Sequence, residues 1–208
     1  MTQYGFYFDS SRCTGCKTCE LVCKDYHDLG PDILFRRIYD YEGGTWDKRD
    51  DGTWDCHAFN YHVSVSCNHC DKPACVENCP SGAMRKDAQT GLVNTDPDVC
   101  LGCGACRAAC PYDAPRIDRT ARVARKCDGC LARVRNGEQP MCVGSCPLRA
   151  LEFGPISDLR KQYGSAAQIA PLPAPDTHPN LVVNSCQVTD SGLYDFTQGS
   201  IANPKEVE

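Results

Sequence analysis

The fold of this chain is decided by the stretch Cys100-Leu101-Gly102-Cys103-Gly104-Ala105-Cys106-Arg107-Ala108-Ala109-Cys110-Pro111. Its spacing, C-x2-C-x2-C-x3-C-P, is a ligand pattern for [4Fe–4S] clusters. The first three thiolates lie within seven residues and can bind three iron corners of one cube. The fourth follows after three intervening residues, points away from that loop and binds the second cluster of a pair. Pro111 fixes the backbone φ angle and suits the turn after the last ligand.

Three further groups of four cysteines occur along the chain. They are Cys13-x2-Cys16-x2-Cys19-x3-Cys23, Cys67-x2-Cys70-x4-Cys75-x3-Cys79 and Cys127-x2-Cys130-x11-Cys142-x3-Cys146. In chain order they are groups one, two and four, and the stretch quoted above is group three. The longer spacings in groups two and four lengthen a loop between ligands without removing one. Of the 18 cysteines only Cys56 and Cys186 are left over, and we expect these two to be ordinary small residues.

The composition agrees with a core that is partly inorganic. The hydrophobic share of 41% includes the cysteines, and about 32% remains without them, below the usual apolar share. The net charge of −5 argues against nucleic-acid binding, which favours a basic domain. No apolar run is long enough to span a membrane, and the N-terminal stretch lacks the features of a signal peptide. We therefore expect no nucleic-acid partner and no membrane span.

Other uses of the cysteines fit less well. A disulfide framework is expected in secreted proteins, and the crowding of group one does not suit it. Group four alone could form a four-cysteine zinc site, whereas groups one and three do not show the paired knuckles of such sites. Covalent haem needs C-x-x-C-H, and a Rieske centre needs two histidine ligands; neither pattern is present. The five histidines form no ligand pattern, so we expect them to be structural or surface residues.

The fold class predicted is α+β, with two bacterial-type 2[4Fe–4S] ferredoxin-like modules, one inserted in the other. Groups two and three, with a hairpin-like stretch at residues 85–94 between them, predict one module at residues 60–112. Groups one and four must then pair across it, in a module made of residues 1–59 and 113–170. The aromatic stretch Tyr4–Asp9 is strand-like and is expected to pair beside Leu151-Glu152-Phe153.

The exchange of the last cysteine within each pair of groups predicts four ligand sets. Sets one to four are, in order, Cys13, Cys16, Cys19 and Cys146; Cys67, Cys70, Cys75 and Cys110; Cys100, Cys103, Cys106 and Cys79; and Cys127, Cys130, Cys142 and Cys23. Four thiolates leave no open iron for a substrate. Because no other catalytic constellation is visible, we expect one-electron transfer rather than catalysis, with the four clusters supplying the chemistry.

Three segments fall outside the cysteine groups. The insertion at residues 24–59 carries aromatic residues, expected to cover the clusters or a partner, and an acidic stretch at 47–51, expected to be a solvated hairpin tip. The Pro-rich tail at residues 171–208 cannot build its own core, and its apolar Leu181-Val182-Val183 favours an extended course on a partner. Eight basic residues between 107 and 135 form either a solvated face or a set of countercharges. Four clusters of charge −2 would take the net charge from −5 to about −13.

Several stretches resemble the iron–sulfur subunits of dimethyl sulfoxide reductases. They are residues 4–19, Ser66-Cys67-Asn68-His69-Cys70, Cys79-Pro80-Ser81-Gly82-Ala83-Met84, Cys146-Pro147-Leu148-Arg149-Ala150-Leu151 and Asn203-Pro204-Lys205-Glu206-Val207. The resemblance implies a non-catalytic subunit between a molybdenum–bis-pterin catalytic subunit and a membrane anchor that oxidises menaquinol. It also implies that the group-three cluster lies nearest the anchor and the group-one cluster nearest the catalytic subunit. Nitrate reductase-like subunits have Trp where Cys103 stands, so a four-iron cluster is implied here.

Two alternatives remain open at this point. The chain could be the equivalent subunit of formate dehydrogenase or of another terminal reductase, or it could be a free polyferredoxin. The Pro-rich tail and the aromatic insertion argue against a free carrier, which needs neither. The resemblance implies a peripheral place on the bacterial cytoplasmic membrane through the anchor, on the periplasmic face if a partner with a twin-arginine signal carries the chain across.

Overall fold

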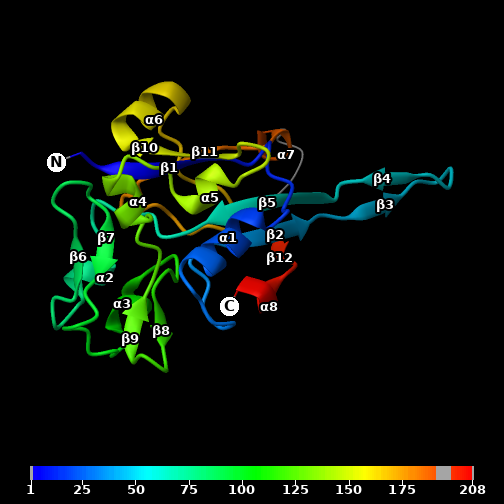
Figure 1. The fold of residues 1–208 in the computed structure, drawn as a ribbon. Coiled ribbons are helices and arrows are strands. Elements are labelled where there is room, and N and C mark those ends of the chain that lie inside the picture. The colour runs from blue at the N-terminus through cyan, green and yellow to red at the C-terminus, as the bar shows by residue number, and fades with distance from the viewer. Residues whose placement is uncertain (1, 191–197, 208) are drawn as a thin grey trace.

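Short helices and small sheets are connected by loops (Figure 1). The cysteine groups lie partly in these loops and partly on the short helices. The computed structural model describes residues 2–190 and 198–207. In chain order the elements are β1 (Tyr4–Asp9), α1 (Thr18–Tyr26), β2 (Arg37–Gly43), β3 (Trp46–Lys48), β4 (Trp54–Cys56), β5 (Phe59–Val65), α2 (Ala74–Glu77), β6 (Met84–Lys86), β7 (Val93–Thr95), α3 (Ala105–Ala109), β8 (Arg116–Asp118), β9 (Val123–Arg125), α4 (Leu131–Arg135), α5 (Met141–Gly144), β10 (Leu151–Pro155), α6 (Ile156–Tyr163), β11 (Leu181–Asn184), α7 (Gln187–Asp190), β12 (Ser200–Ile201) and α8 (Pro204–Val207). The α+β class is as predicted. No helix among the described residues could cross a membrane.

The sheet β10-β1-β11 joins the two ends of the cysteine-bearing region. Strand β1 pairs with β10 in antiparallel register, with Phe8 opposite Leu151 and Phe6 opposite Phe153. The predicted pairing of these two stretches is therefore confirmed. One face of the sheet packs against α6, where the Tyr7 ring stacks on Tyr163 at 3.7 Å between centroids. The other face carries Phe6 and Phe8 into a core that also contains cysteines of groups one and four.

The apolar stretch Leu181-Val182-Val183 of the C-terminal tail packs on this chain's own sheet, so the prediction that it lies on a partner is wrong. Strand β11 runs parallel to β1, with Tyr7 opposite Val182. Leu181 and Val183 pack in the cysteine-containing core, and Val182 packs on the α6 side, so both faces of the strand are buried. Further along, β12 pairs with β2, and Val207 of α8 is buried. The open edge of β1 offers the hydrogen bonds that the tail satisfies. Residues 191–197 of the tail lie outside the described residues.

Val182→Asp tests this placement of the tail. Val182 has no exposed surface, so the new carboxylate would be buried without a partner, which costs about 3–5 kcal/mol. For a protein of this length we expect the melting temperature to fall by roughly 6–20 °C, measured by circular dichroism of the iron-loaded protein. Ala174→Asp, at an exposed position of the same tail, is the matched control and should melt like the parent. Equal melting temperatures for the two variants would contradict the buried strand.

The aromatic insertion forms strand β2 and a projecting arm, and it leads into strand β5. β2 and β5 pair from Arg37 opposite Val65 to Gly43 opposite Phe59, and the pair continues into the hairpin β3–β4, which extends away from the body (Figure 1). The side chains of β3 are exposed, as predicted for the acidic hairpin tip. Trp46 and Trp54 are also exposed, whereas Phe35 packs with cysteines of groups one, two and four.

Two small hairpins support the cysteine loops of the inserted region. β6 and β7 pair with Arg85 opposite Asn94, which confirms the hairpin predicted at residues 85–94. β8 and β9 form a second hairpin, with Arg116 opposite Arg125. In Figure 1 both hairpins lie beside α2 and α3, on the side of the molecule away from α6. Each hairpin lies next to one of the short helices that carry cysteines.

Candidate metal centres

The cysteines of set one surround an apolar cavity. Cys13, Cys16, Cys19 and Cys146 line it together with apolar residues that include Phe8, Ile38 and Leu151. The loop before α1 turns through Gly15, whose φ is +66° and whose position leaves no room for a Cβ beside the His62 ring. α1 then begins, and it carries Cys19 and Cys23 one helical turn apart. Because their spacing is four residues, both point from the same face of the helix.

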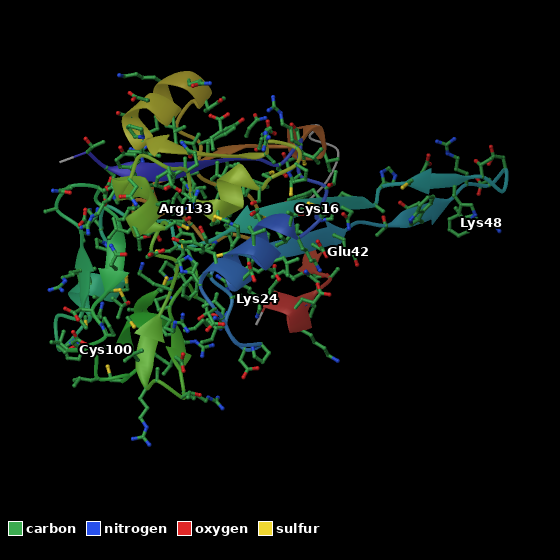
Figure 2. All side chains as sticks on the ribbon, in the orientation of Figure 1. Cys16, Lys24, Glu42, Lys48, Cys100 and Arg133 are labelled. Atoms are coloured by element: carbon green, nitrogen blue, oxygen red, sulfur yellow. The ribbon has the colours of Figure 1, made fainter. Side chains whose placement is uncertain are left out.

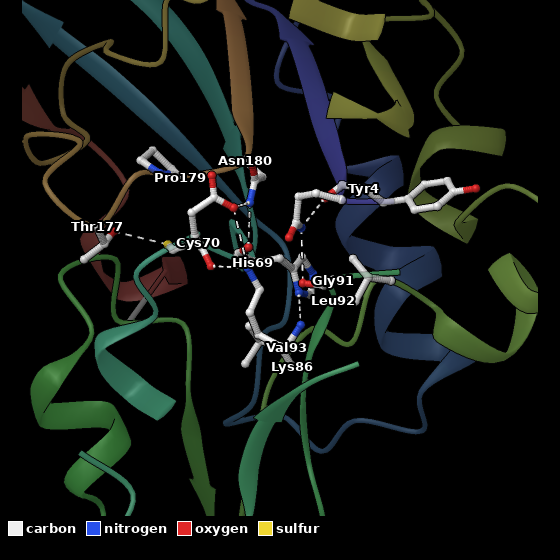
Figure 3. Close-up of polar contacts among 12 residues, drawn as sticks. Tyr4, His69, Cys70, Lys86, Gly91, Leu92, Val93, Thr177, Pro179 and Asn180 are labelled. Carbon is white, nitrogen blue, oxygen red and sulfur yellow. Dashed lines mark hydrogen bonds and ion pairs between the residues drawn. The ribbon is translucent and has the colours of Figure 1, made fainter. Parts of the chain in front are cut away.

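The cysteines of set two line a second cavity. Cys67, Cys70, Cys75 and Cys110 lie around it with Val93 and Tyr112. Thr177 of the tail donates its hydroxyl to Cys70 Sγ at 3.2 Å. Figure 3 shows this contact, together with Asn180, which donates to the His69 carbonyl at 2.8 Å. The tail therefore closes over this set as well as completing the sheet.

The cysteines of set three line a third cavity, between α2, α3 and the two hairpins. Cys79, Cys100, Cys103 and Cys106 lie around it. Backbone N–H groups point at two of the sulfurs: Met84 donates to Cys79 Sγ at 3.4 Å, and Ala124 donates to Cys100 Sγ at 3.3 Å. Such donors favour a negatively charged sulfur, as a metal-bound thiolate is. Each of the two hairpins thus supplies one donor to this set.

The cysteines of set four are all buried. Cys127, Cys130, Cys142 and Cys23 come from the loop before α4, from α5 and from α1. Burial raises the pKa of Cys23, and the neighbouring thiols of Cys127, Cys142 and Cys130 raise it further. α1 and α5 pack against each other, which brings Cys23 to the sulfurs of group four. The backbone N–H of Gly129 donates to Cys127 Sγ at 3.4 Å.

The four sets follow one another in the order one, four, two, three. Sets one and four share α1, which carries Cys19 and Cys23. Sets two and three share the packed pair α2 and α3, because Cys75 and Cys106 lie on these helices. Sets four and two meet where Cys127 and Cys67 lie in one buried cluster. In Figure 2 Cys16 of set one and Cys100 of set three lie well apart, with Cys100 at the end of the body away from the arm.

Exposure to solvent differs between the inner and outer sets. Cys16 of set one and Cys103 of set three are exposed. Among the cysteines of sets two and four none is exposed. Cys186, which belongs to no set, is buried in the core, and Cys56 lies exposed on the arm. The ends of the series therefore reach the surface, whereas its middle is covered.

Comparisons with known proteins agree with this geometry. Residues 58–156 match the family model described as "4Fe-4S dicluster domain". The sequence is 55% identical over 208 residues, the full length of both proteins, to the B subunit of anaerobic dimethyl sulfoxide reductase from Haemophilus influenzae. It is 56% identical over 207 residues, 99% of each protein, to the same subunit from Escherichia coli K12. This protein is a member of the family of dimethyl sulfoxide reductase B subunits. The B subunit of polysulfide reductase from Wolinella succinogenes is more distant, with 35% identity over 186 residues, 87% of this sequence and 93% of the relative.

Membership of this family of dimethyl sulfoxide reductase subunits gives the cysteine sets their chemistry. The protein is an electron-transfer subunit with [4Fe–4S] clusters and without an active site of its own. The family model covers groups two, three and four but not group one. The predicted resemblance to the iron–sulfur subunits of these reductases is thus confirmed.

Protons and iron would compete for the buried sulfurs of this family member. Burial is the largest cause that raises the pKa of Cys75 and Cys127 to about 12 and that of Cys70 to about 11. Without iron these thiols are protonated near neutral pH. Iron would hold them as thiolates and replace the proton. Together with the N–H donors, the donor set therefore suits clusters bound by four thiolates each.

Two buried residues beside the sulfurs carry positive charge. Lys126 belongs to the basic stretch 107–135, for which a countercharge role was one of the two predicted interpretations. Arg36 was missed by the sequence analysis, although its place next to Arg37 within the otherwise apolar stretch 33–38 was a signal. Arg107, Arg119 and Arg122 of the basic stretch lie toward solvent, at the surface around β8 and β9.

Two of the histidines also lie close to cysteines of this site. His27 Nε2 is 3.7 Å from Cys130 Sγ and 3.6 Å from Asp128 Oδ1. His69 is fully buried, and its Nδ1 accepts the Val93 N–H at 2.9 Å (Figure 3). Burial lowers the pKa of His69 well below its usual range, and Lys126 lowers it further, so this ring is neutral. The expected structural role of His69 agrees with this place in the core.

Proposed function

We propose that the chain holds four [4Fe–4S] clusters and relays electrons between a membrane anchor that oxidises quinol and a molybdenum-pterin catalytic subunit. The catalytic partner would reduce dimethyl sulfoxide or related S- and N-oxides. Support comes from the names of the relatives that match the full sequence at 55–56% identity. The observation that carries the proposal is the exposure pattern, since only the two outer sets have an exposed cysteine, Cys16 and Cys103.

The sixteen grouped cysteines are proposed as the iron ligands, in the four sets given above. When bound, the clusters supply one-electron transfer. The chain's own residues would bind them, cover the inner two and leave one cysteine of each outer set exposed. We assign the set-one end, from which the arm β3–β4 extends, to the catalytic subunit and the set-three end to the anchor. This assignment follows the resemblance described for the family.

The same proposal includes two ferredoxin-like modules. One would comprise residues 60–112 and the other residues 1–59 with 113–170. The position of Cys146 in the cavity of Cys13, Cys16 and Cys19 supports the pairing of groups one and four. The chain would be peripheral to the bacterial cytoplasmic membrane, held through the anchor. If the catalytic partner is exported by the twin-arginine route, the complex would lie on the periplasmic face.

Affinity purification from membranes grown without oxygen on dimethyl sulfoxide tests the partners. We expect the tagged protein to recover a pterin-containing protein and an integral membrane protein in equal amounts. Recovery of the tagged protein alone, from membranes that reduce dimethyl sulfoxide, would support a free carrier instead. Reduction of a different acceptor by the recovered complex would assign the protein to another terminal reductase.

Iron and acid-labile sulfide analysis tests the number of clusters. We expect about sixteen iron and sixteen sulfide per molecule, as four four-iron clusters require. Cys56→Ser and Cys186→Ser together should leave both values unchanged, since neither cysteine belongs to a set. A value near twelve iron, or zinc in place of iron, would contradict the proposed cofactor content.

A further inference from the structure

Two buried cations of this protein have no carboxylate partner among the described residues. Arg36 is 2% exposed and Lys126 is 5% exposed. Two other buried arginines, Arg37 and Arg116, both lie beside Asp113, at 3.9 Å and 2.8 Å. An unpaired buried cation is strongly unfavourable, so Arg36 and Lys126 need another source of negative charge. Lys126 donates directly to a proposed cluster ligand, Cys67, and Arg36 reaches another, Cys19, through Ser64.

Lys126 lies at the joint between sets two and four. Its ammonium donates to Cys67 Sγ at 3.4 Å, to the Cys127 carbonyl at 2.8 Å and to the Val93 carbonyl. Cys67 belongs to set two, and Cys127 belongs to set four. An ammonium has three protons to donate, and the three contacts use all of them. The charge is therefore fixed in place rather than mobile.

Arg36 lies at the joint between sets one and four. Its guanidinium donates to Ser64 Oγ and to Ser66 Oγ, both at 3.0 Å, and lies over the Phe6 ring at 4.9 Å. Ser64 Oγ in turn is 3.6 Å from Cys19 Sγ, a ligand of set one. Cys23 of set four lies one helical turn from Cys19, on the same face of α1. Burial disfavours the charged guanidinium, but the neighbouring thiols of Cys142, Cys19, Cys127 and Cys23 raise the pKa of Arg36 above its usual range. The two serines hold the guanidinium between the two sets.

We propose that Arg36 and Lys126 are fixed countercharges that set the reduction potentials of the clusters on either side of them. Arg36 would raise the potentials of clusters one and four, and Lys126 would raise those of clusters two and four. Reduction adds negative charge to a cluster. A buried cation nearby favours this added charge, because the low local dielectric screens the attraction between them poorly. Cluster four would receive both contributions and cluster three neither. This inference rests on the proposed function, since it requires the four clusters.

The experiment compares Arg36→Gln and Lys126→Gln in the purified complex by redox titration followed by electron paramagnetic resonance. Each variant is expected to lower the potentials of two clusters, with at least a tenfold change in the reduction equilibrium, about 59 mV for a one-electron couple. One signal should move in both variants, and one should move in neither. This pattern needs no prior assignment of signals to sets. Iron content is measured first and shows whether four clusters are present. A failure of the proposed function can then be distinguished from a failure of the countercharge inference.

Three further variants make the test specific for buried charge. Arg36→Lys and Lys126→Arg keep the charge and should keep the potentials. Lys161→Gln removes the same charge from a side chain that is 79% exposed on α6 and should move no signal. Equal shifts in all neutral variants, or unchanged potentials in Arg36→Gln and Lys126→Gln with full iron, would overturn the proposal. Loss of iron from both neutral variants, with full iron in the charge-preserving ones, would also overturn it in favour of a purely structural role.

Discussion

Cys146→Ala is expected to abolish the spectroscopic signal of the set-one cluster and to leave the set-four signal in place. In sequence Cys146 belongs to group four, but it lines the cavity of Cys13, Cys16 and Cys19. It lies there because it follows α5, which packs on α1. Loss of one ligand should remove about one to four of roughly sixteen irons. Quinol-dependent reduction by the complex should fall by at least about tenfold, because the relay would end before the catalytic subunit.

Matched variants decide whether the exchange of ligands is right. The electron paramagnetic resonance spectrum of Cys146→Ala should match that of Cys16→Ala, which removes another proposed ligand of set one. It should differ from that of Cys130→Ala, which removes a ligand of set four. Cys186→Ala controls for the loss of a buried sulfur, since Cys186 lies in the same core without belonging to a set. If Cys146→Ala instead resembles Cys130→Ala, each group keeps its own last cysteine and the proposed pairing fails.

Local spacing and strand patterns were enough to predict much of the fold. The ligand spacing fixes short loops and single helical turns, so the positions of the cysteine groups translate directly into local structure. The stretch Tyr4–Asp9 and Leu151-Glu152-Phe153 were expected to pair, and they do so residue for residue. The hairpin between groups two and three was also correct, because both of its strands are close in sequence.

Features that depend on distant parts of the sequence were not predictable in this way. Leu181-Val182-Val183 is apolar, and composition alone could not say whether a partner or the chain's own β1 would cover it. The burial of Arg36 depends on β5 and the residue after it, which place Ser64 and Ser66 at its guanidinium. Both misses have the same cause: the partner of the residue was more than 25 positions away, so the local sequence could not identify that partner.

Removal of iron and sulfide is expected to lower the urea midpoint of unfolding to less than half its value in the loaded protein. Cysteines are part of three of the buried clusters, among them Cys142, Cys67 and Cys106, and without iron they no longer link separate segments. Structural zinc contributes about 10–16 kcal/mol to the folding of small domains, as much as the whole stability of a typical protein, about 5–15 kcal/mol. Far- and near-ultraviolet circular dichroism on the same samples would show whether secondary structure outlasts side-chain packing. An iron-free protein with an unchanged midpoint and m-value would contradict an inorganic contribution to the core.

The pH dependence of the iron-free protein gives this prediction a definite sign. Burial raises the pKa of Cys75 and Cys127 from about 9 to about 12, and that of Cys13 to about 11. The folded state therefore binds these protons more tightly than the unfolded state, so their contribution to stability is complete below pH 9. It is lost as the pH rises through 9 toward 11–12, and the urea midpoint should fall over that window. The loaded protein should show no such fall, because iron has displaced the protons. Reassembly with iron and sulfide should instead become more favourable as the pH rises toward 9, since binding releases protons from the thiols.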